Sequence, residues 1–310
     1  MPLKANISGT WRDLTPSIKI GTEWKSPDKI YFYTGTIWQE IWEKTMPKNW
    51  SVIASAGALT NKTRLAGIGG SYNAALAASG YDGGYSTTAG KFNGTAWTSI
   101  ASLNTEGRYP STSQPGFGTS TNAIVTGLGS EFEATEYYNN STWSVISYVD
   151  ESHVLNGQYN GCSCGTSYST GLFTGGRYYR KTIKFNGTVW SNANSDLLAT
   201  TYNAAMAGSQ TSALFIGGAG CTVFQYNGTV WDYASNYLSS AIQQNSAFGT
   251  SASSITSCGG NNYSEEYNGT SWMLTGKLNT SRYQFGTAGT TTAGLAFGGG
   301  TSGYSTEKYE

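Results

Sequence analysis

Histidine, the side chain most often used for proton transfer, occurs once in the 310 residues, at position 153. His153 stands in the run Asp150, Glu151, Ser152, His153, which contains the residue types of a nucleophilic triad. A triad needs its members to be fixed by separate structural elements, whereas these four follow one another on one segment. We therefore interpret His153 as a solvated loop residue.

The same scarcity argues against a transition-metal centre. A catalytic zinc site with three histidine ligands needs more histidines than the chain has. The four cysteines, Cys162, Cys164, Cys221 and Cys258, each lie in a strand-like segment rich in small residues. Cys162 and Cys164 are two residues apart, so on a strand they share one face and form no metal knuckle by themselves. We expect small buried thiols in the reduced state, with no bound metal and no cofactor.

Paired carboxylates are the remaining catalytic option. Glu131 and Glu133 lie on one predicted loop, and two suitably spaced carboxylates hydrolyse glycosidic bonds. No ladder of supporting acids accompanies them, so we expect a protein that is not an enzyme. Glycan cleavage stays open as an alternative.

Composition narrows the class of partner. Eighteen basic and eighteen acidic residues balance to a formal net charge of zero, which gives no electrostatic attraction to nucleic acid or to an anionic membrane. The N-terminus lacks the apolar run of a signal peptide, and no stretch of 18 apolar residues occurs. We expect no nucleic-acid partner, no membrane insertion and synthesis in a cytoplasm without a secretory leader.

A long repeat organises most of the chain. Tryptophan recurs at intervals of 41 to 47 residues, which is the period of propeller blades. Five of the six are preceded by an aromatic residue and an Asn-Gly or Asn-Asn pair, and Asn-Gly is typical of a type I′ hairpin turn with positive φ at both residues. The repeat tryptophans are Trp50, Trp97, Trp143, Trp190, Trp231 and Trp272.

Each repeat predicts four strands. A strand of Gly and Ala comes first, as at 203–209, and small residues suit the crowded axis of a ring. An apolar strand ending in a Gly pair follows, as at 213–218, and then come the strand before the Asn-Gly turn and the tryptophan strand. The Trp50 strand lacks three preceding strands, and residues 304–310 lack a fourth. We therefore expect these two segments to pair and complete a sixth blade, which removes exposed sheet edges.

The ordered trio of Gly-Gly doublet, aromatic strand residue and tryptophan resembles the kelch repeat. The resemblance covers residues 47–310 and implies a six-bladed, kelch-like β-propeller, although residues 122–130 lack the doublet and the first blade is irregular. Some kelch-like propellers resemble galactose oxidase, whose copper site uses two His and two Tyr and cannot be built with one histidine. The turn sequence also lacks the Asp of the sialidase-like Asp box, and the Asn-Gly-Thr triplets are interpreted as turns rather than as glycosylation sites.

Residues 1–46 have a different pattern and form a predicted N-terminal β-rich module. It reads as short hairpins turned at Gly21 and Gly35. The segment resembles N-terminal modules of bacteriophage virion proteins, and this resemblance implies an attachment role. The candidate anchoring residues are Trp11, Trp24, Trp38 and Trp42.

The loops divide between the two faces of the predicted ring. Short turns gather on the face where the Trp50 strand begins, and long loops rich in Tyr and Arg gather on the other face, away from the module. Tyr and Arg make adaptable contacts at protein interfaces. The candidate binding residues are Arg108, Tyr109, Arg177, Tyr178, Tyr179, Arg180, Tyr263, Arg282 and Tyr283.

These features together predict a non-enzymatic structural protein of a phage virion, located in the tail or in a head or tail appendage. The N-terminal module would bind other virion proteins, and the propeller would present an adhesion face to a host surface glycan or protein. Homo-oligomerisation and copy number are left open. The alternatives are an intracellular kelch-type interaction scaffold and a glycan-cleaving propeller enzyme.

Overall fold

The computed structural model describes residues 4–7, 10–13, 18–20, 23–25, 29–33, 38–43, 48–54, 62–107, 114–129, 134–149, 161–176, 179–201, 203–218, 220–242, 244–257, 262–299 and 305–310. The chain divides into two compact units, Met1–Pro47 and Lys48–Glu310. Every regular element in the described residues is a β-strand. Before Lys48 only the backbone is described, so the anchoring role of the four N-terminal tryptophans stays a prediction.

The first unit contains three antiparallel hairpins, each with a tryptophan in its second strand. The pairs Asn6↔Trp11, Lys19↔Trp24 and Tyr33↔Trp38 set their registers. Gly21 and Gly35, where the sequence predicted turns, lie outside the described residues. The strands are β1 (Lys4–Ile7), β2 (Thr10–Asp13), β3 (Ile18–Ile20), β4 (Glu23–Lys25), β5 (Lys29–Tyr33) and β6 (Trp38–Glu43).

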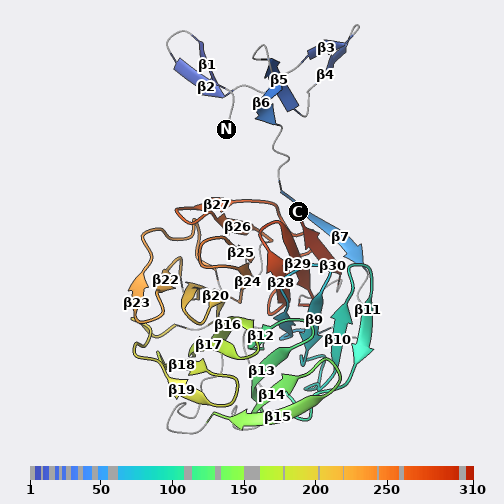
Figure 1. The fold of residues 1–310 in the computed structure, drawn as a ribbon, viewed down its shortest axis with the longest axis vertical. Helices are drawn as coiled ribbons and strands as arrows, with labels where there is room; N and C mark the ends of the chain where they lie inside the picture. The colour runs from blue at the N-terminus through green and yellow to red at the C-terminus, as the bar shows by residue number, and fades with distance from the viewer. Residues whose placement is uncertain are drawn as a thin grey trace. The chain divides into compact units, whose positions relative to one another are not determined.

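The second unit is a six-bladed β-propeller, as predicted, in which six four-stranded antiparallel sheets surround one axis (Figure 1). Blade 1 has β8 (Ala66–Ile68), β9 (Ala75–Ala78), β10 (Ala89–Phe92) and β11 (Trp97–Ile100); blade 2 has β12 (Gly116–Gly118), β13 (Ala123–Leu128), β14 (Ala134–Tyr138) and β15 (Trp143–Tyr148); blade 3 has β16 (Gly161–Ser167), β17 (Thr170–Gly175), β18 (Thr182–Phe185) and β19 (Trp190–Asn192). Blade 4 has β20 (Ala204–Ser209), β21 (Ser212–Gly217), β22 (Val223–Tyr226) and β23 (Trp231–Tyr233); blade 5 has β24 (Ser246–Gly249), β25 (Ser254–Ser257), β26 (Ser264–Tyr267) and β27 (Trp272–Leu274); blade 6 has β28 (Gly286–Thr290), β29 (Ala293–Phe297), β30 (Thr306–Tyr309) and β7 (Trp50–Ala54).

Blade 6 joins the two ends of this unit and closes the ring. Its third strand, β30, pairs antiparallel with β7, and Tyr309 lies opposite Trp50. The main chains of Asn49 and Glu310 also exchange two hydrogen bonds, of 3.1 and 3.4 Å. The predicted pairing of the Trp50 strand with residues 304–310 is therefore confirmed for the described part of that segment.

The Asn-Gly turns stand where the sequence predicted them, but the predicted type I′ conformation is wrong. Phe92 pairs directly with Trp97, so the loop between them has four residues. The side-chain oxygen of Asn93 accepts the N–H groups of Thr95 and Ala96, and only Gly94 has a positive φ, of 96°. The turn is therefore held by hydrogen bonds from the following N–H groups to the Asn side chain, and Asn does not need the left-handed backbone that was expected. The same contacts recur at Asn139, Asn186, Asn227 and Asn268.

The innermost strands are made of small residues because they approach one another closely. A Cβ atom on Gly67 would lie 2.3 Å from the main-chain nitrogen of Thr287 in the neighbouring blade. Where an inner strand does carry a large side chain, as at Phe117, the first two strands of the next blade have Gly165 and Gly171 against its ring. The predicted role of the Gly/Ala strand is thus explained by backbone-to-backbone packing.

Among the buried polar contacts between neighbouring blades, two kinds recur around the ring. In the first, which we call the indole tie, a repeat tryptophan donates its indole N–H to a hydroxyl on the third strand of the preceding blade. The acceptor stands three residues before the aromatic that ends that strand. The four pairs, each at 2.9 Å, are Trp50 with Ser264, Trp97 with Thr306, Trp190 with Thr135, and Trp231 with Thr182.

At Trp143 and Trp272 the corresponding positions of the preceding blade hold Ala89 and Val223, which offer no hydroxyl. Both indole nitrogens are buried and find no hydrogen-bond partner among the described residues. The indole tie is therefore missing where the third strand of the preceding blade carries a residue without a hydroxyl at the acceptor position.

The second contact, the carboxylate tie, runs in the opposite direction. A fully buried glutamate on the third strand accepts main-chain N–H groups from the loop that leaves the preceding blade. Glu136 accepts from Asn104 at 2.9 Å and from Thr105 at 2.6 Å. Glu265 and Glu307 make the same contacts with the loops at Ser239 and at Asn279 and Thr280.

Candidate functional site

The loops that were predicted to form the binding face connect the second strand to the third and the fourth strand to the next blade. We call this face the loop side. Buried leucines tie its two loop sets together, because their N–H groups donate to the neighbouring loop of the same blade. The pairs are Leu103 with Thr87, Leu197 with Arg180, Leu238 with Cys221 and Leu278 with Asn262, at 2.8 to 3.1 Å. The sequence analysis did not use this signal, a Leu six or seven residues after the tryptophan.

Four of the candidate binding residues, Tyr179, Arg180, Tyr263 and Tyr283, lie on the described loop side with exposed or partly exposed side chains. Arg180 is exposed and donates through Nη1 to the carbonyl of Leu198 at 3.2 Å. Tyr179 beside it is half-buried. Tyr263, in blade 5, is 39% exposed, and the ammonium of Lys277 lies 4.1 Å from the centre of its ring. The sequence had not singled out Lys277 or Leu198.

The prediction that Arg282 belongs to the binding face is wrong, because its side chain is fully buried. Its Nη2 lies 2.6 Å from Glu307 Oε1, and its Nη1 donates to the carbonyl of Gly298 at 2.8 Å. Burial lowers the pKa of Arg282, while the hydrogen bond and the charge of Glu307 oppose that shift. Arg282 therefore holds the carboxylate tie of blade 6, and its neighbour Tyr283 is half-buried. Arg108, Tyr109, Arg177 and Tyr178 lie outside the described residues.

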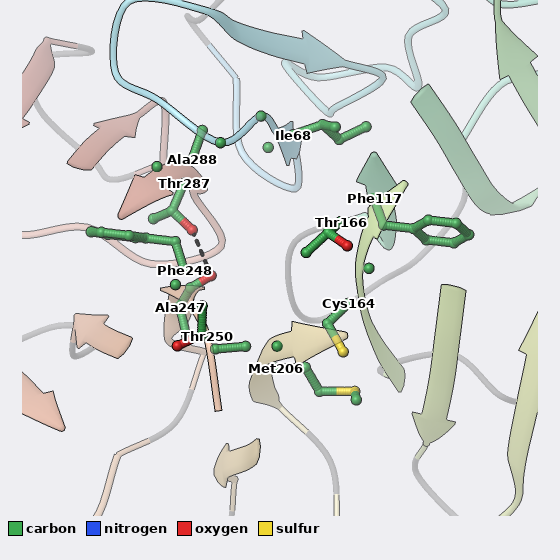
Figure 2. A pocket seen from close by; sticks show the side chains of 18 of the residues that line it. Ile68, Phe117, Cys164, Thr166, Met206, Ala247, Phe248, Thr250, Thr287 and Ala288 are labelled. Carbon is green, nitrogen blue, oxygen red and sulfur yellow. Dashed lines mark hydrogen bonds between the residues drawn. The ribbon is translucent and has the colours of Figure 1, made fainter. Parts of the chain in front are cut away.

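A cavity lies elsewhere, on the axis at the opposite face. This face carries the turns between first and second strands and the Asn-Gly turns, and we call it the turn side. The cavity has a volume of about 300 Å³ and is lined by the first strands of all six blades and the turns that follow them. We call it the axial chamber (Figure 2).

A ring of one residue per blade forms the floor of the axial chamber and separates it from a smaller cavity of about 60 Å³ toward the loop side. Methionine is by far the largest residue of this ring, and the others are small. Figure 2 shows the Phe117 and Phe248 rings pointing away from the cavity, and most of the residues that line it are glycines or have small side chains. The floor residues are Gly67, Gly116, Ser163, Met206, Ala247 and Thr287.

The chamber offers hydroxyl groups but no charge among the described residues that line it. Four threonines with exposed side chains stand at its mouth, each directly after a glycine at or near the end of a first strand. The signal that could have revealed them is this recurring Gly-Thr pair, which the sequence analysis did not single out. They are Thr119, Thr166, Thr250 and Thr290.

Cys164 lies in the chamber wall, and Cys162 lies by the smaller cavity. Both are free and buried, as predicted, and burial raises the pKa of each thiol above its ordinary value. Cys221 is free and half-buried, while Cys258, His153, Glu131 and Glu133 lie outside the described residues. In the described part of the chain, no three His, Cys, Asp or Glu residues gather as a metal site would require. That part also contains no helix long and apolar enough to span a membrane.

Comparison with known proteins supports the fold and nothing finer. No protein-family model and no curated protein matches the sequence. Among solved structures, 242 chains match. One of them, described as "Structure of YjhT", covers 83% of this chain and 96% of its own, with a TM-score of 0.60 and 15% sequence identity. At that identity the likeness shows a shared β-propeller fold.

Proposed function

We propose that this chain is a non-enzymatic structural protein of a phage virion, in the tail or in a head or tail appendage. In this proposal the kelch-like propeller is a binding module, and residues 1–46 attach it to other virion proteins. The resemblance of the N-terminal segment to phage virion modules supports the setting. The closed ring supports the role of a rigid display scaffold, because binding residues are often carried on loops held by such a scaffold.

The observation that carries the binding role is the exposure of loop-side aromatic and apolar side chains. Tyr237 is 51% exposed and Leu198 is 39% exposed, although the leucines next to them in sequence are buried anchors. Tyr263 stands out equally, with Lys277 against its ring. Exposed Tyr beside Lys or Arg is a typical composition of a protein or glycan contact surface, since the ring stacks and the cation orients the partner.

We expect the double substitution Tyr179→Ala with Arg180→Ala, and separately Tyr263→Ala, to reduce binding of the purified protein to host cells. Each should leave the melting temperature close to that of wild type, because surface substitutions change stability by about 0.5 kcal/mol or less. Val230→Ala is the matched control, since Val230 is exposed on the turn side. Flow cytometry with labelled protein measures the binding.

Wild-type binding by all loop-side variants would contradict the adhesion role. The virion setting has its own test, which is mass spectrometry of purified particles followed by cryo-EM. Absence of the chain from the particles of the phage that encodes it would contradict that part of the proposal.

A further inference from the structure

The wall of the axial chamber includes the free edge of the first strand of each blade. In every blade the first strand is the end strand of its sheet, so only one of its two edges pairs within the blade. The other edge faces the axis, and an end strand presents backbone N–H and C=O groups along its free edge. A few of these groups join neighbouring blades, as when Gly289 donates to the carbonyl of Gly69 at 3.0 Å. The chamber therefore presents donors and acceptors from six directions.

The side chains of the chamber add hydroxyls at the mouth and apolar surface near the floor. Thr166 and Thr250 stand at the entrance on different blades, whereas Ala247 and Met206 belong to the floor, since they line both cavities. A charged guest would lose its hydration without meeting a counter-charge among the described lining residues, and this loss is costly. A purely apolar guest would leave the strand edges without hydrogen-bond partners.

We propose that the axial chamber binds one neutral sugar ring, such as the terminal residue of a glycan, which enters from the turn side. A pyranose ring has hydroxyls that radiate from its edge and both donate and accept, and its C–H faces are apolar. That distribution matches a wall with donors and acceptors in all six directions above a floor of small and apolar side chains. A volume of about 300 Å³ is also at the lower end of the range for small-molecule sites, which suits one ring rather than an oligosaccharide.

This inference rests on the proposed glycan-binding function but places a sugar site on the face opposite the predicted loops. Ligand-detected saturation-transfer NMR on the full chain tests it with galactose, glucose and N-acetylglucosamine as neutral probes, and with glucuronic acid as the charged probe. We expect a transfer signal from at least one neutral sugar and none from glucuronic acid.

Blocking the entrance should abolish the signal. Thr166→Trp places an indole in the mouth from an exposed position, and Thr188→Trp is its matched control on the Asn-Gly turn of the same blade, outside the chamber. We expect loss of transfer in the first variant and wild-type transfer in the second. If Thr166→Trp fails to fold, Gly70→Trp replaces it, because a Cβ at Gly70 meets no atom within 4 Å.

Two results overturn the inference: no transfer to any neutral sugar in wild type, or undiminished transfer in a folded blocked variant. Failure of the proposed function is a separate outcome. If the neutral sugar binds and Thr166→Trp abolishes its signal, but no loop-side or chamber variant alters host-cell binding, the chamber site stands and the adhesion role does not.

Discussion

The junction between blades 5 and 6 and the junction between blades 1 and 2 are built from equivalent strands but are held by different polar contacts. The first has an indole tie from Trp50 and a carboxylate tie from Glu307. The second has only the carboxylate tie from Glu136, and the indole of Trp143 has no partner among the described residues. The junctions made by Trp97, Trp190 and Trp231 show the reverse case, because each has an indole tie but no glutamate to form the carboxylate tie. The residues at the glutamate position are Gly90, Ile183 and Phe224.

The comparison teaches that either tie is enough for an ordinary junction, whereas the junction into the closing blade has both. Blade 6 takes β7 from the beginning of the ring and β28, β29 and β30 from its end. Pairing segments so distant in sequence costs more loop-closure entropy than pairing neighbouring strands. The added contacts at this junction include the ion pairs Arg282–Glu307 and Lys48–Glu266, both at 2.6 Å. We infer that closure of the ring, rather than any single blade, governs the stability of the propeller.

The largest expected effect comes from breaking the buried ion pair at the closing junction. Arg282→Met should lower the free energy of unfolding by about 3–5 kcal/mol, because it leaves the buried Glu307 carboxylate without its cation. Urea denaturation followed by tryptophan fluorescence measures the change. Arg180→Met is the control, with a change of about 0.5 kcal/mol or less, because Arg180 is exposed. Equal effects in the two variants would show that Arg282 is not part of the closure.

An intermediate effect is expected at the junction with a single carboxylate tie. Glu136→Ala should destabilise the protein by about 2–3 kcal/mol, since it leaves the N–H groups of Asn104 and Thr105 without their acceptor. Hydrogen exchange at these two amides should accelerate more than exchange in blade 4. The control is Glu106→Ala, which removes an exposed acid two residues from Asn104. If the two amides remain protected from exchange in Glu136→Ala, the carboxylate tie does not hold this junction.

The sequence was sufficient to predict the architecture because the blades repeat. Tryptophans at a constant interval, each following an aromatic and a turn, identify the outer strands, and the unmatched Trp50 strand identifies how the ring closes. Local chemistry was harder to predict. The Asn of each turn was assigned a left-handed backbone, but its carboxamide instead captures the N–H groups of the residues that follow.

Contacts between distant residues explain the other errors at the candidate site. Arg282 looks like the other loop arginines in sequence, and its burial depends on Glu307, which lies 25 residues later on β30. The axial chamber was overlooked because it is built mostly from glycine, alanine and threonine. Each of these residues is unremarkable on its own strand, and a cavity arises only when six such strands meet at the axis.

The smallest expected effect is a gain in stability, and it tests the indole tie most directly. Thr182 accepts the indole N–H of Trp231, and Val223 occupies the equivalent position for Trp272. The indole nitrogen of Trp272 is buried without a partner among the described residues. Val223→Thr keeps the shape of the side chain and supplies a hydroxyl, so it should complete the missing indole tie and raise the free energy of unfolding by about 0.5–1.5 kcal/mol. Val125→Thr is the matched control, because Val125 is a fully buried strand valine that is not at an indole position, and burying an unpaired hydroxyl there should destabilise the protein. Urea denaturation of the two variants gives the comparison. Destabilisation of the same size in both variants would mean that the new hydroxyl on the third strand does not reach the indole. The indole tie would then not be a general feature of the junction between blades.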